Sequence, residues 1–285
     1  MNNIIFNIKN LKCGYKKSKR PVLEIDELEI EKGKITFFIG SSGVGKSTIL
    51  ESLGLMNKTI QQNDDTTLEF YSNNHTQCYF DLWKKNEKTL SNFRKKHFNF
   101  IFQSNNLFNS LDAYQNIMIP ALLAGEKEDE IKNKTIDILK NILPDLEIKK
   151  DKKINVIKLS GGQRQRLAFA RAIVSKFDVL FADEPTGNLD HYNAHNIMNY
   201  LCEKEKDSTV IVVSHDTELA VSKGDRIVFI DKMIDLNFNP KISWGKISKS
   251  SIFKKENNSW KNPQNELIKD DELIKYLRLK LKTNE

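Results

Sequence analysis

The chain has 285 residues, 39% of them hydrophobic and 29% charged, which is typical of a soluble globular protein. Its formal net charge is +7, but residues 241–285 hold 11 Lys and Arg against 6 Asp and Glu and so carry +5 of it. The remaining 240 residues are nearly neutral, which argues against a nucleic-acid-binding body. No apolar run approaches the roughly 20 residues of a membrane-spanning helix, and the first residues lack the pattern of a secretory signal. We therefore expect a protein of the cytoplasm.

Hydrophobic patterning predicts two kinds of strand. Alternating apolar residues in 3–11 and 22–30 predict half-buried antiparallel strands near the N-terminus. Short continuous apolar runs follow, rich in β-branched and aromatic residues and separated by helical stretches, as in the buried parallel strands of an α/β sheet. These runs occupy residues 35–39, 179–182, 210–213 and 227–230, and helical periodicity extends over 121–146 and 161–176.

The last 50 residues differ in character. Residues 241–262 are rich in Lys, Ser and Asn and predict a basic linker, and the near-heptad spacing of Leu267, Ile274, Leu277 and Leu281 predicts an amphipathic helix. We expect a domain boundary between residues 235 and 236. The helix could pack on the rest of the chain, bind a second subunit or contact anionic lipid. Packing is favoured, because an amphipathic helix usually covers the nearest apolar surface.

A glycine-rich segment between a predicted strand and a predicted helix is the first candidate site. Residues 40–47, GSSGVGKS, match the pattern G-x-x-x-x-G-K-[ST] of a phosphate-binding loop, or P-loop. Glycines let backbone N–H groups approach phosphate oxygens without a Cβ atom in the way, and the helix N-terminus adds its dipole. We expect Lys46 to contact the β- and γ-phosphates and Ser47 to bind Mg²⁺. The candidate nucleotide-binding residues are Gly40, Ser41, Ser42, Gly43, Val44, Gly45, Lys46, Ser47 and Thr48.

An acidic pair, Asp183-Glu184, ends the apolar run at 179–182. Ligands of open α/β sheets bind at the carboxyl ends of the strands. Asp183 is therefore predicted to hold Mg²⁺ and Glu184 to polarise the attacking water. Taken alone, such a pair is usually a solvated strand end, but the P-loop upstream favours the catalytic interpretation.

A second glycine-rich turn opens the predicted helix at 161–176. Ser160 can cap this helix, and Gly161 and Gly162 leave its N–H groups open to a second anion. An ordinary capped helix would also explain the segment. However, five of the chain's 12 glycines lie in these two motifs.

Together these motifs resemble the nucleotide-binding subunits of ABC (ATP-binding cassette) transporters. Residues 159–163, LSGGQ, look like the ABC signature, and the order of P-loop, Gln103, signature, Asp183-Glu184 and His215 is the family's order. The resemblance covers about residues 3–233. It implies an α/β fold, that of a P-loop NTPase ABC cassette with a RecA-like parallel-sheet core and an N-terminal antiparallel β subdomain. A helical subdomain is expected at about residues 104–172, within a cassette spanning 1–235, followed by the tail 236–285.

The resemblance also implies a role for each matching residue. Two cassettes pair head to tail around two ATP molecules, so that Ser160 and Gly162 of one chain contact the γ-phosphate held by the other chain's P-loop. Asp190 matches the loop that crosses this dimer, and Tyr15 matches the aromatic residue that stacks on adenine. The implied catalytic residues are Glu184 as general base, His215 as γ-phosphate sensor and Gln103. The implied Mg²⁺ ligands are Ser47, Gln103 and Asp183. The further residues implied to contact nucleotide are Tyr15, Ser160, Gly161, Gly162, Gln163 and Asp190.

Two stretches narrow the resemblance within the family. Residues 181–190, FADEPTGNLD, and 100–125 look like the subfamily that serves lipoprotein release, macrolide or peptide export and cell division. Its members transmit mechanical work to separate permeases with few transmembrane helices and large extracytoplasmic domains. Residues 104–120 would then form the groove for the permease. The resemblance implies a homodimer or paired cassettes, ATP and Mg²⁺, no nucleic acid, and peripheral attachment to the cytoplasmic face of the inner membrane.

Two departures and two alternatives stay open at this stage. No glycine occurs between Gly54 and Gly125, where the family usually has a glycine-containing hairpin, so strand pairing in 59–100 is open. The interval from Lys46 to Gln103 is also about ten residues longer than in the subfamily. One alternative is a nutrient-import cassette. The other is a soluble ABC-type ATPase, although the 56 residues between Gln103 and Ser160 leave no room for a long coiled coil.

Overall fold

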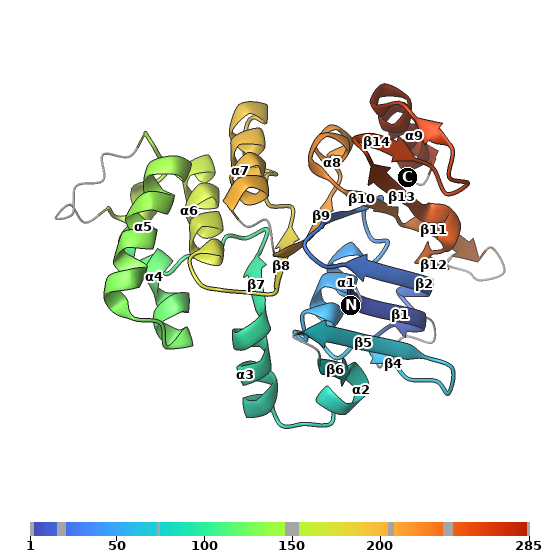
Figure 1. Ribbon diagram of the computed structural model, residues 1–285, viewed down its shortest axis with the longest axis horizontal. Helices are drawn as coiled ribbons and strands as arrows, with labels where there is room; N and C mark the ends of the chain where they lie inside the picture. The colour runs from blue at the N-terminus through green and yellow to red at the C-terminus, as the bar shows by residue number, and fades with distance from the viewer. Residues whose placement is uncertain are drawn as a thin grey trace. The chain divides into compact units, whose positions relative to one another are not determined.

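The computed structural model describes residues 3–15, 21–72, 75–145, 154–204, 208–235 and 242–283 (Figure 1). The chain forms two compact units, and each is described here by itself. Unit 1 joins Met1–Asn92 to Asp207–Glu285, and unit 2 is the continuous segment Phe93–Lys206. Among the described residues, no helix is both long and apolar enough to cross a membrane.

The first sheet of unit 1 is mainly antiparallel. Its central strand β1 (Ile4–Cys13) pairs antiparallel with β2 (Leu23–Glu31) and with β5 (Thr67–Ser72). Burial alternates along β1 and β2, because successive side chains point to opposite faces of a strand. The antiparallel strands predicted from the N-terminal sequence are confirmed. The described order is β11 (Asp231–Asp235), β12 (Ile242–Ile247), β2, β1, β5 and β6 (His75–Cys78), with β4 (Ile60–Gln61) beside β1.

The second sheet of unit 1 has a parallel core. Strand β3 (Ile35–Ile39) lies between β9 (Thr209–Ser214) and β10 (Arg226–Phe229), parallel to both. All three strands are buried along their whole length, as their continuous apolar runs predict. Helix α1 (Lys46–Leu53) contacts β1 of the first sheet and β9 of the second, and helix α8 (Thr217–Lys223) contacts β3.

The pairing left open by the sequence in 59–100 is a hairpin followed by two helices. Strand β6 (His75–Cys78) pairs antiparallel with β5, and the Asn73-Asn74 connection lies outside the described residues. Helices α2 (Tyr79–Leu82) and α3 (Glu87–His97) then lead to unit 2.

The prediction of a linker at 241–262 is wrong. The segment forms strands β12 (Ile242–Ile247), β13 (Ile252–Glu256) and β14 (Ser259–Lys261), with η2 (Lys249–Ser251) between β12 and β13. Strand β12 pairs with β2 and also with β11 (Asp231–Asp235), while β13 pairs with β10. The predicted boundary after residue 235 therefore does not separate compact units. The segment is polar in composition, but the side chains of Ile247, Phe253 and Trp260 are buried and attach it to the rest of unit 1.

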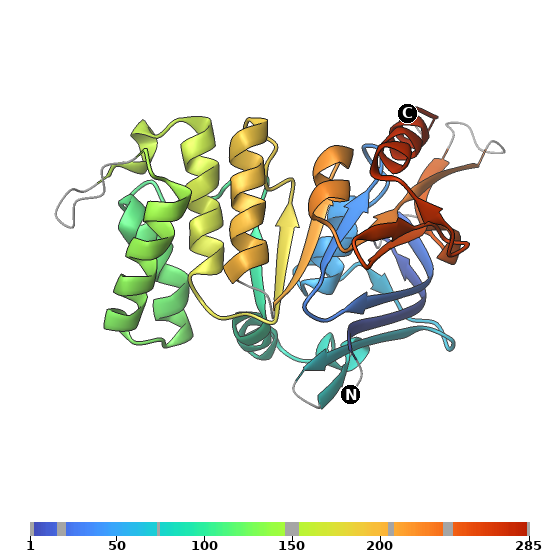
Figure 2. The same cartoon turned by 45° about the horizontal axis from the view of Figure 1, so that its top comes forward.

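The C-terminal helix exists but begins later than predicted. Strand β15 (Leu267–Ile268) precedes α9 (Asp270–Thr283), whose buried residues are Leu273 and Leu277. Leu267, predicted on the helix face, is exposed in β15. Helix α9 packs on α8, and Arg278 pairs with Glu218 at 2.5 Å. Figures 1 and 2 both show α9 beside the strands of the same C-terminal segment. Packing on the rest of the chain, the favoured role of the tail, is therefore observed.

Unit 2 combines a strand pair with a layer of helices. Strand β7 (Phe98–Ile101) runs parallel to β8 (Val179–Asp183). Helix α4 (Ala113–Ala124) packs against α5 (Glu128–Ile142) and α6 (Gly161–Ile173), which lie side by side in both views (Figures 1 and 2). Helix α5 also contacts α7 (His191–Lys204). The periodicity predicted over 121–146 is interrupted because Gly125, at φ +83°, ends α4 in the left-handed conformation.

Candidate nucleotide-binding and hydrolysis site

The P-loop of unit 1 connects β3 to α1, as predicted. Gly43 and Gly45 adopt φ values of +78° and +92°, a region that strongly favours glycine. Gly40 is required for a different reason, because a Cβ atom there would lie 2.8 Å from Val44 Cγ2 and 3.2 Å from Ile230 Cβ. The loop thus combines left-handed turns with close backbone packing, the geometry with which backbone N–H groups surround phosphate oxygens.

The polar groups of this loop suit a phosphate. Lys46 Nζ donates to the carbonyl oxygens of Gly40 and Ser41 at 2.6 and 2.9 Å, so the ammonium group lies over the loop. The Ser41 hydroxyl is buried and has no hydrogen-bond partner among the described residues. A buried hydroxyl without a partner is unfavourable unless a ligand or water satisfies it. A nucleotide phosphate fits both the cation and the open hydroxyl.

His215 follows β9 at the same sheet edge as the P-loop. Because Ile39 pairs with Ser214 in the parallel register of β3 and β9, Gly40 and His215 are the next residues of the two neighbouring strands. His215 is exposed. Tyr15, expected to stack on adenine, is also exposed, and it immediately precedes residues 16–20, which lie outside the description.

Unit 2 brings Gln103 and the acidic pair to one sheet edge. Ile101 of β7 pairs with Ala182 of β8, so Gln103 and Glu184 each lie two residues beyond the same rung of the ladder. Asp183 ends β8, and Glu184 adopts a φ of +48°, which is unusual for a residue with a side chain. Unfavourable backbone conformations of this kind concentrate at functional sites.

The signature turn is a capped helix start. Ser160 Oγ accepts from the Gln163 N–H at 3.2 Å, and the Ser160 N–H donates to Gln163 Oε1 at 3.0 Å, which forms a reciprocal capping box. Ser160 and Gly161 are exposed, and a Cβ atom at Gly161 would meet nothing within 4 Å. The turn therefore presents its open face to solvent in the single chain.

The loop after Glu184 runs close to the signature turn within unit 2. A Cβ atom on Gly162 would lie 3.4 Å from Leu189 Cδ2 and 3.6 Å from the Asn188 carbonyl oxygen. Asp190 caps α7 by accepting from the Asn193 N–H at 2.9 Å and from Asn193 Nδ2 at 2.7 Å. The backbone and then the side-chain hydrogen bond from Asn193 lower the pKa of the exposed Asp190 carboxyl.

Three residues of α6 that the sequence analysis did not single out bind neighbouring segments of unit 2. Gln165 connects the helix to the Glu184 loop, and Arg171 binds the two residues after Ser104. Arg166 forms a forked pair with Asp145, at 2.9 Å for Nη1–Oδ1 and 3.0 Å for Nη2–Oδ2. Burial raises the pKa of Asp145, but hydrogen bonds from Arg166 and Gln163 outweigh this effect and lower it. In the sequence, these contacts are signalled only by polar residues inside a predicted helix.

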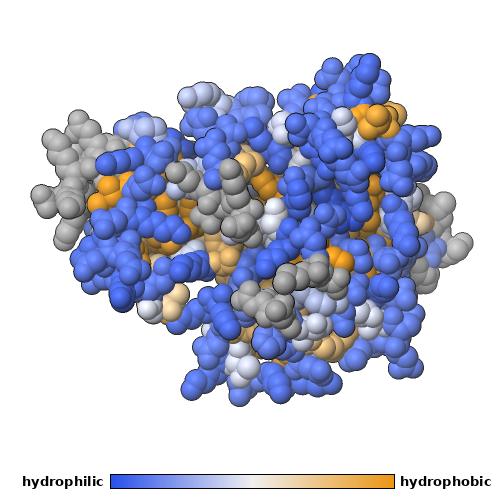
Figure 3. Space-filling view, in the orientation of Figure 1, coloured by the Kyte–Doolittle hydropathy of each residue, from blue (hydrophilic) through white to orange (hydrophobic). Residues whose placement is uncertain are grey.

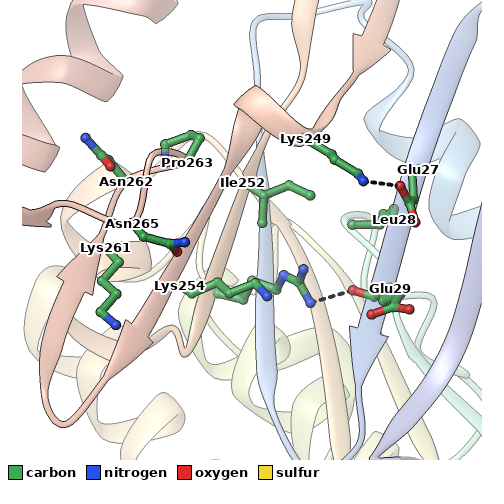
Figure 4. Close-up of a pocket in the computed structure, with 11 residues that line it drawn as sticks. Glu27, Leu28, Glu29, Lys249, Ile252, Lys254, Lys261, Asn262, Pro263 and Asn265 are labelled. Atoms are coloured by element: carbon green, nitrogen blue, oxygen red, sulfur yellow. Dashed lines mark hydrogen bonds and ion pairs between the residues drawn. The ribbon is translucent and has the colours of Figure 1, made fainter.

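A separate pocket of about 280 Å³ lies in unit 1 between β2 and the C-terminal segment (Figure 4). Lys249 points toward Glu27, and the two pair at 2.7 Å. Arg226 pairs with Glu31 at 3.4 Å, and Lys261 with Glu256 at 2.6 Å. These three cations are neutralised within the chain, and no P-loop residue lines the pocket. It is therefore distinct from the candidate nucleotide site.

The chain belongs to the ABC transporter family, whose sequence profile matches residues 23–187. It is 31% identical over 224 residues to the lipoprotein-releasing system ATP-binding protein LolD of Rickettsia bellii, covering 77% of this chain and 92% of LolD. It is 39% identical over 210 residues to the macrolide export ATP-binding/permease protein MacB of Campylobacter fetus subsp. fetus, covering 73% of this chain. The chain spans only 30% of that MacB.

Solved structures agree with this assignment. The dimeric bacterial ABC transporter cassette MJ0796 is 29% identical, with a TM-score of 0.64 over 79% of this chain and 94% of MJ0796. A post-hydrolysis dimer of the same cassette, bound to ADP and Pi, is 30% identical with a TM-score of 0.65. The cassette cbiO1 of Clostridium perfringens is 24% identical and covers 99% of this chain with a TM-score of 0.67, which shows the fold alone. The expected ABC cassette fold and ATPase family are confirmed.

Proposed function

We propose that this ATPase drives a separate membrane permease of the lipoprotein-release or export type, with Glu184 as general base. The observation that carries the hydrolytic part is the register of β7 and β8, which sets Gln103 and the Asp183-Glu184 pair at one sheet edge. The carboxyl ends of parallel strands are where open α/β sheets bind ligands. The similarity to LolD, which extends over 92% of that protein, supports the transporter assignment.

The residues of this chain divide the chemistry among them. Lys46 and the P-loop N–H groups bind the β- and γ-phosphates, and Glu184 accepts a proton from the attacking water. His215 contacts the γ-phosphate, and Tyr15 stacks on adenine. Ser47, Gln103 and Asp183 supply the oxygen ligands that suit Mg²⁺. When bound, Mg²⁺ neutralises charge on the phosphate oxygens.

A second copy of the chain, or a paired cassette, completes the site in this proposal. Ser160, Gly161, Gly162 and Gln163 face the nucleotide held by the partner's P-loop, and Asp190 lies in the loop that crosses between the two chains. Two observations support this arrangement: the signature turn is exposed in the single chain, and MJ0796 is a dimer.

The permease contact is proposed on unit 2, from residue 104 into α4. Phe108 is 50% exposed and Leu123 67% exposed, and Leu122 is also exposed. Figure 3 shows hydrophobic surface in the area of α4 and α5 on the face in view. Exposed apolar patches of this kind commonly mark protein contacts. In this proposal the chain is attached peripherally to the cytoplasmic face of the inner membrane.

The test is purification of a tagged Glu184→Gln variant from detergent-solubilised membranes in the presence of ATP. Mass spectrometry of the co-purifying proteins should identify a permease with few membrane spans and a large extracytoplasmic domain. Phe108→Asp is the matched variant, because it places a charge on the proposed contact without touching the nucleotide site. Recovery of the cassette only in the soluble fraction, with ribosomes or nucleic acid, would overturn the proposal.

A further inference from the structure

Glu184 begins a tight loop that leads to α7. Its φ of +48° is unfavourable for a residue with a side chain, so the surrounding contacts must hold it there. Within the loop, the Gly187 N–H donates to the Glu184 carbonyl at 3.2 Å, and the Leu189 N–H donates to the Thr186 carbonyl at 2.9 Å. These turns leave the two ends of the loop to be fixed from outside.

Gln165 of α6 supplies that external support. Its Nε2 donates to the carbonyl oxygen of Glu184 at 3.1 Å, and its Oε1 accepts from the N–H of Asn188 at 2.9 Å. The side chain is buried, with 1% of its surface exposed. A primary amide carries its donor and its acceptor on separate atoms, so it can bind a carbonyl and an N–H four residues further on at the same time. One side chain therefore closes the loop at both ends.

The helix that carries Gln165 is itself fixed at both ends. Near its start, Arg166 forms the forked pair with Asp145. At its other end, Asn99 Nδ2 on β7 donates to the Ala172 carbonyl at 2.6 Å and to Ser175 Oγ at 3.0 Å. Since α6 opens with the signature turn, Gln165 ties the backbone of Glu184 to the same rigid element that presents Ser160.

We propose that Gln165 is a positioning residue for hydrolysis: it holds the Glu184 backbone in its left-handed conformation and thereby aims the carboxylate at the attacking water. The inference rests on the proposed role of Glu184 as general base. Gln165 touches neither nucleotide nor water in this scheme and acts through Glu184 alone. Displacing a reacting group by about 1 Å can lower a rate by about 100-fold.

The decisive variant is Gln165→Met, which keeps the length of the side chain and removes both hydrogen bonds. Steady-state ATPase assays should show kcat lowered about 10- to 100-fold with the KM for ATP changed less than about twofold. Gln165→Glu keeps the acceptor for Asn188 and loses the donor to Glu184, so its kcat should also fall; it serves as the second variant if Gln165→Met is not soluble.

Asn99→Ala is the matched control, since it removes an amide that anchors the same helix at its far end without touching the Glu184 loop. Its melting temperature should fall while kcat per folded protein stays near that of the unmodified chain. An equal fractional loss of kcat in Asn99→Ala and Gln165→Met would mean that Gln165 is merely structural.

A double-mutant cycle with Glu184→Gln separates this inference from the proposed function. If Gln165 acts through Glu184, adding Gln165→Met to Glu184→Gln should lower kcat no further. If Glu184→Gln is inactive and Gln165→Met is fully active, the positioning role fails and the general base stands. If Glu184→Gln itself hydrolyses ATP at the normal rate, the proposed function fails first.

Discussion

Arg171 Nη2 on α6 donates to the main-chain carbonyl of Asn105 at 2.7 Å, and its Nη1 donates to the carbonyl of Asn106 at 2.6 Å. Both asparagines have positive φ values, +59° and +46°. Asparagine tolerates the left-handed conformation better than most residues, and the guanidinium group holds the resulting turn. Burial lowers the pKa of Arg171, but a guanidinium group in a protein stays charged at neutral pH.

Arg171→Met should lower the free energy of unfolding by about 1–3 kcal/mol, because it leaves two carbonyl groups without their donor. Denaturant unfolding followed by circular dichroism measures this change. Arg278→Met is the matched control, since Arg278 makes an exposed ion pair with Glu218, and we expect it to cost less than about 1 kcal/mol. Equal effects of the two substitutions would contradict this assignment.

Lys46→Ala should abolish measurable nucleotide binding, because it removes the cation that lies over the P-loop carbonyls. Titration with a fluorescent ATP analogue measures the dissociation constant. Lys9→Ala, a surface lysine paired with Glu27 in the same unit, should leave it unchanged. An unaltered affinity in Lys46→Ala would remove the P-loop from the nucleotide site.

Glu184→Gln should keep ATP binding and lose most turnover, because the amide cannot accept a proton from water. The unhydrolysed nucleotide should then hold two chains together. Size-exclusion chromatography with and without ATP reports the dimer, and a phosphate-release assay reports turnover. Hydrolysis at a near-normal rate in this variant would refute the general-base role.

Ser160→Arg should block the partner's site while leaving the variant's own P-loop able to bind ATP. A bulky cation replaces the exposed cap of α6 at the surface that faces the second chain in the proposed dimer. The expected result is normal binding of the ATP analogue with hydrolysis lowered by at least about tenfold. If the variant hydrolyses ATP fully, the head-to-tail pairing is wrong.

Trp260→Ala should destabilise unit 1 by about 3–5 kcal/mol, since a fully buried indole is replaced by a cavity. Its Nε1 also donates to the Val221 carbonyl of α8 at 3.2 Å. Leu267→Ala, a nearby position in the chain that is 73% exposed, should change stability by less than about 0.5 kcal/mol. Comparable melting temperatures for the two variants would mean that residues 236–285 are only loosely attached to the rest of unit 1.

The sequence predicted the parts of this fold that depend on local pattern. The strands at 35–39 and 210–213 could be predicted because a buried parallel strand is apolar throughout. The P-loop could be predicted because it needs glycine at positions with φ values that other residues avoid, as at Gly43 and Gly45.

What the sequence did not predict depends on contacts between distant residues. The strands within 242–261 are polar on their exposed faces. The burial of single side chains such as Phe253 and Trp260 depends on contacts with β10 and α8, which the local sequence does not indicate. Gln165 and Arg171 escaped notice for the same reason, since a polar residue in an amphipathic helix is expected to face solvent. Their partners lie 19 and 66 residues away in the chain.

The path of the chain through the two units has a consequence for biosynthesis. Unit 2 is one continuous segment, whereas unit 1 is assembled from two segments on either side of it. Strands β12 and β13 pair with β2 and β10, so the edges of both sheets in unit 1 are covered only after residue 256 has been made. During synthesis unit 2 can therefore fold while β2 still awaits β12 and β3 still awaits β9 and β10. The nucleotide loop lies against Leu23 and Ile230, so its surroundings are complete only after residue 230 has been made.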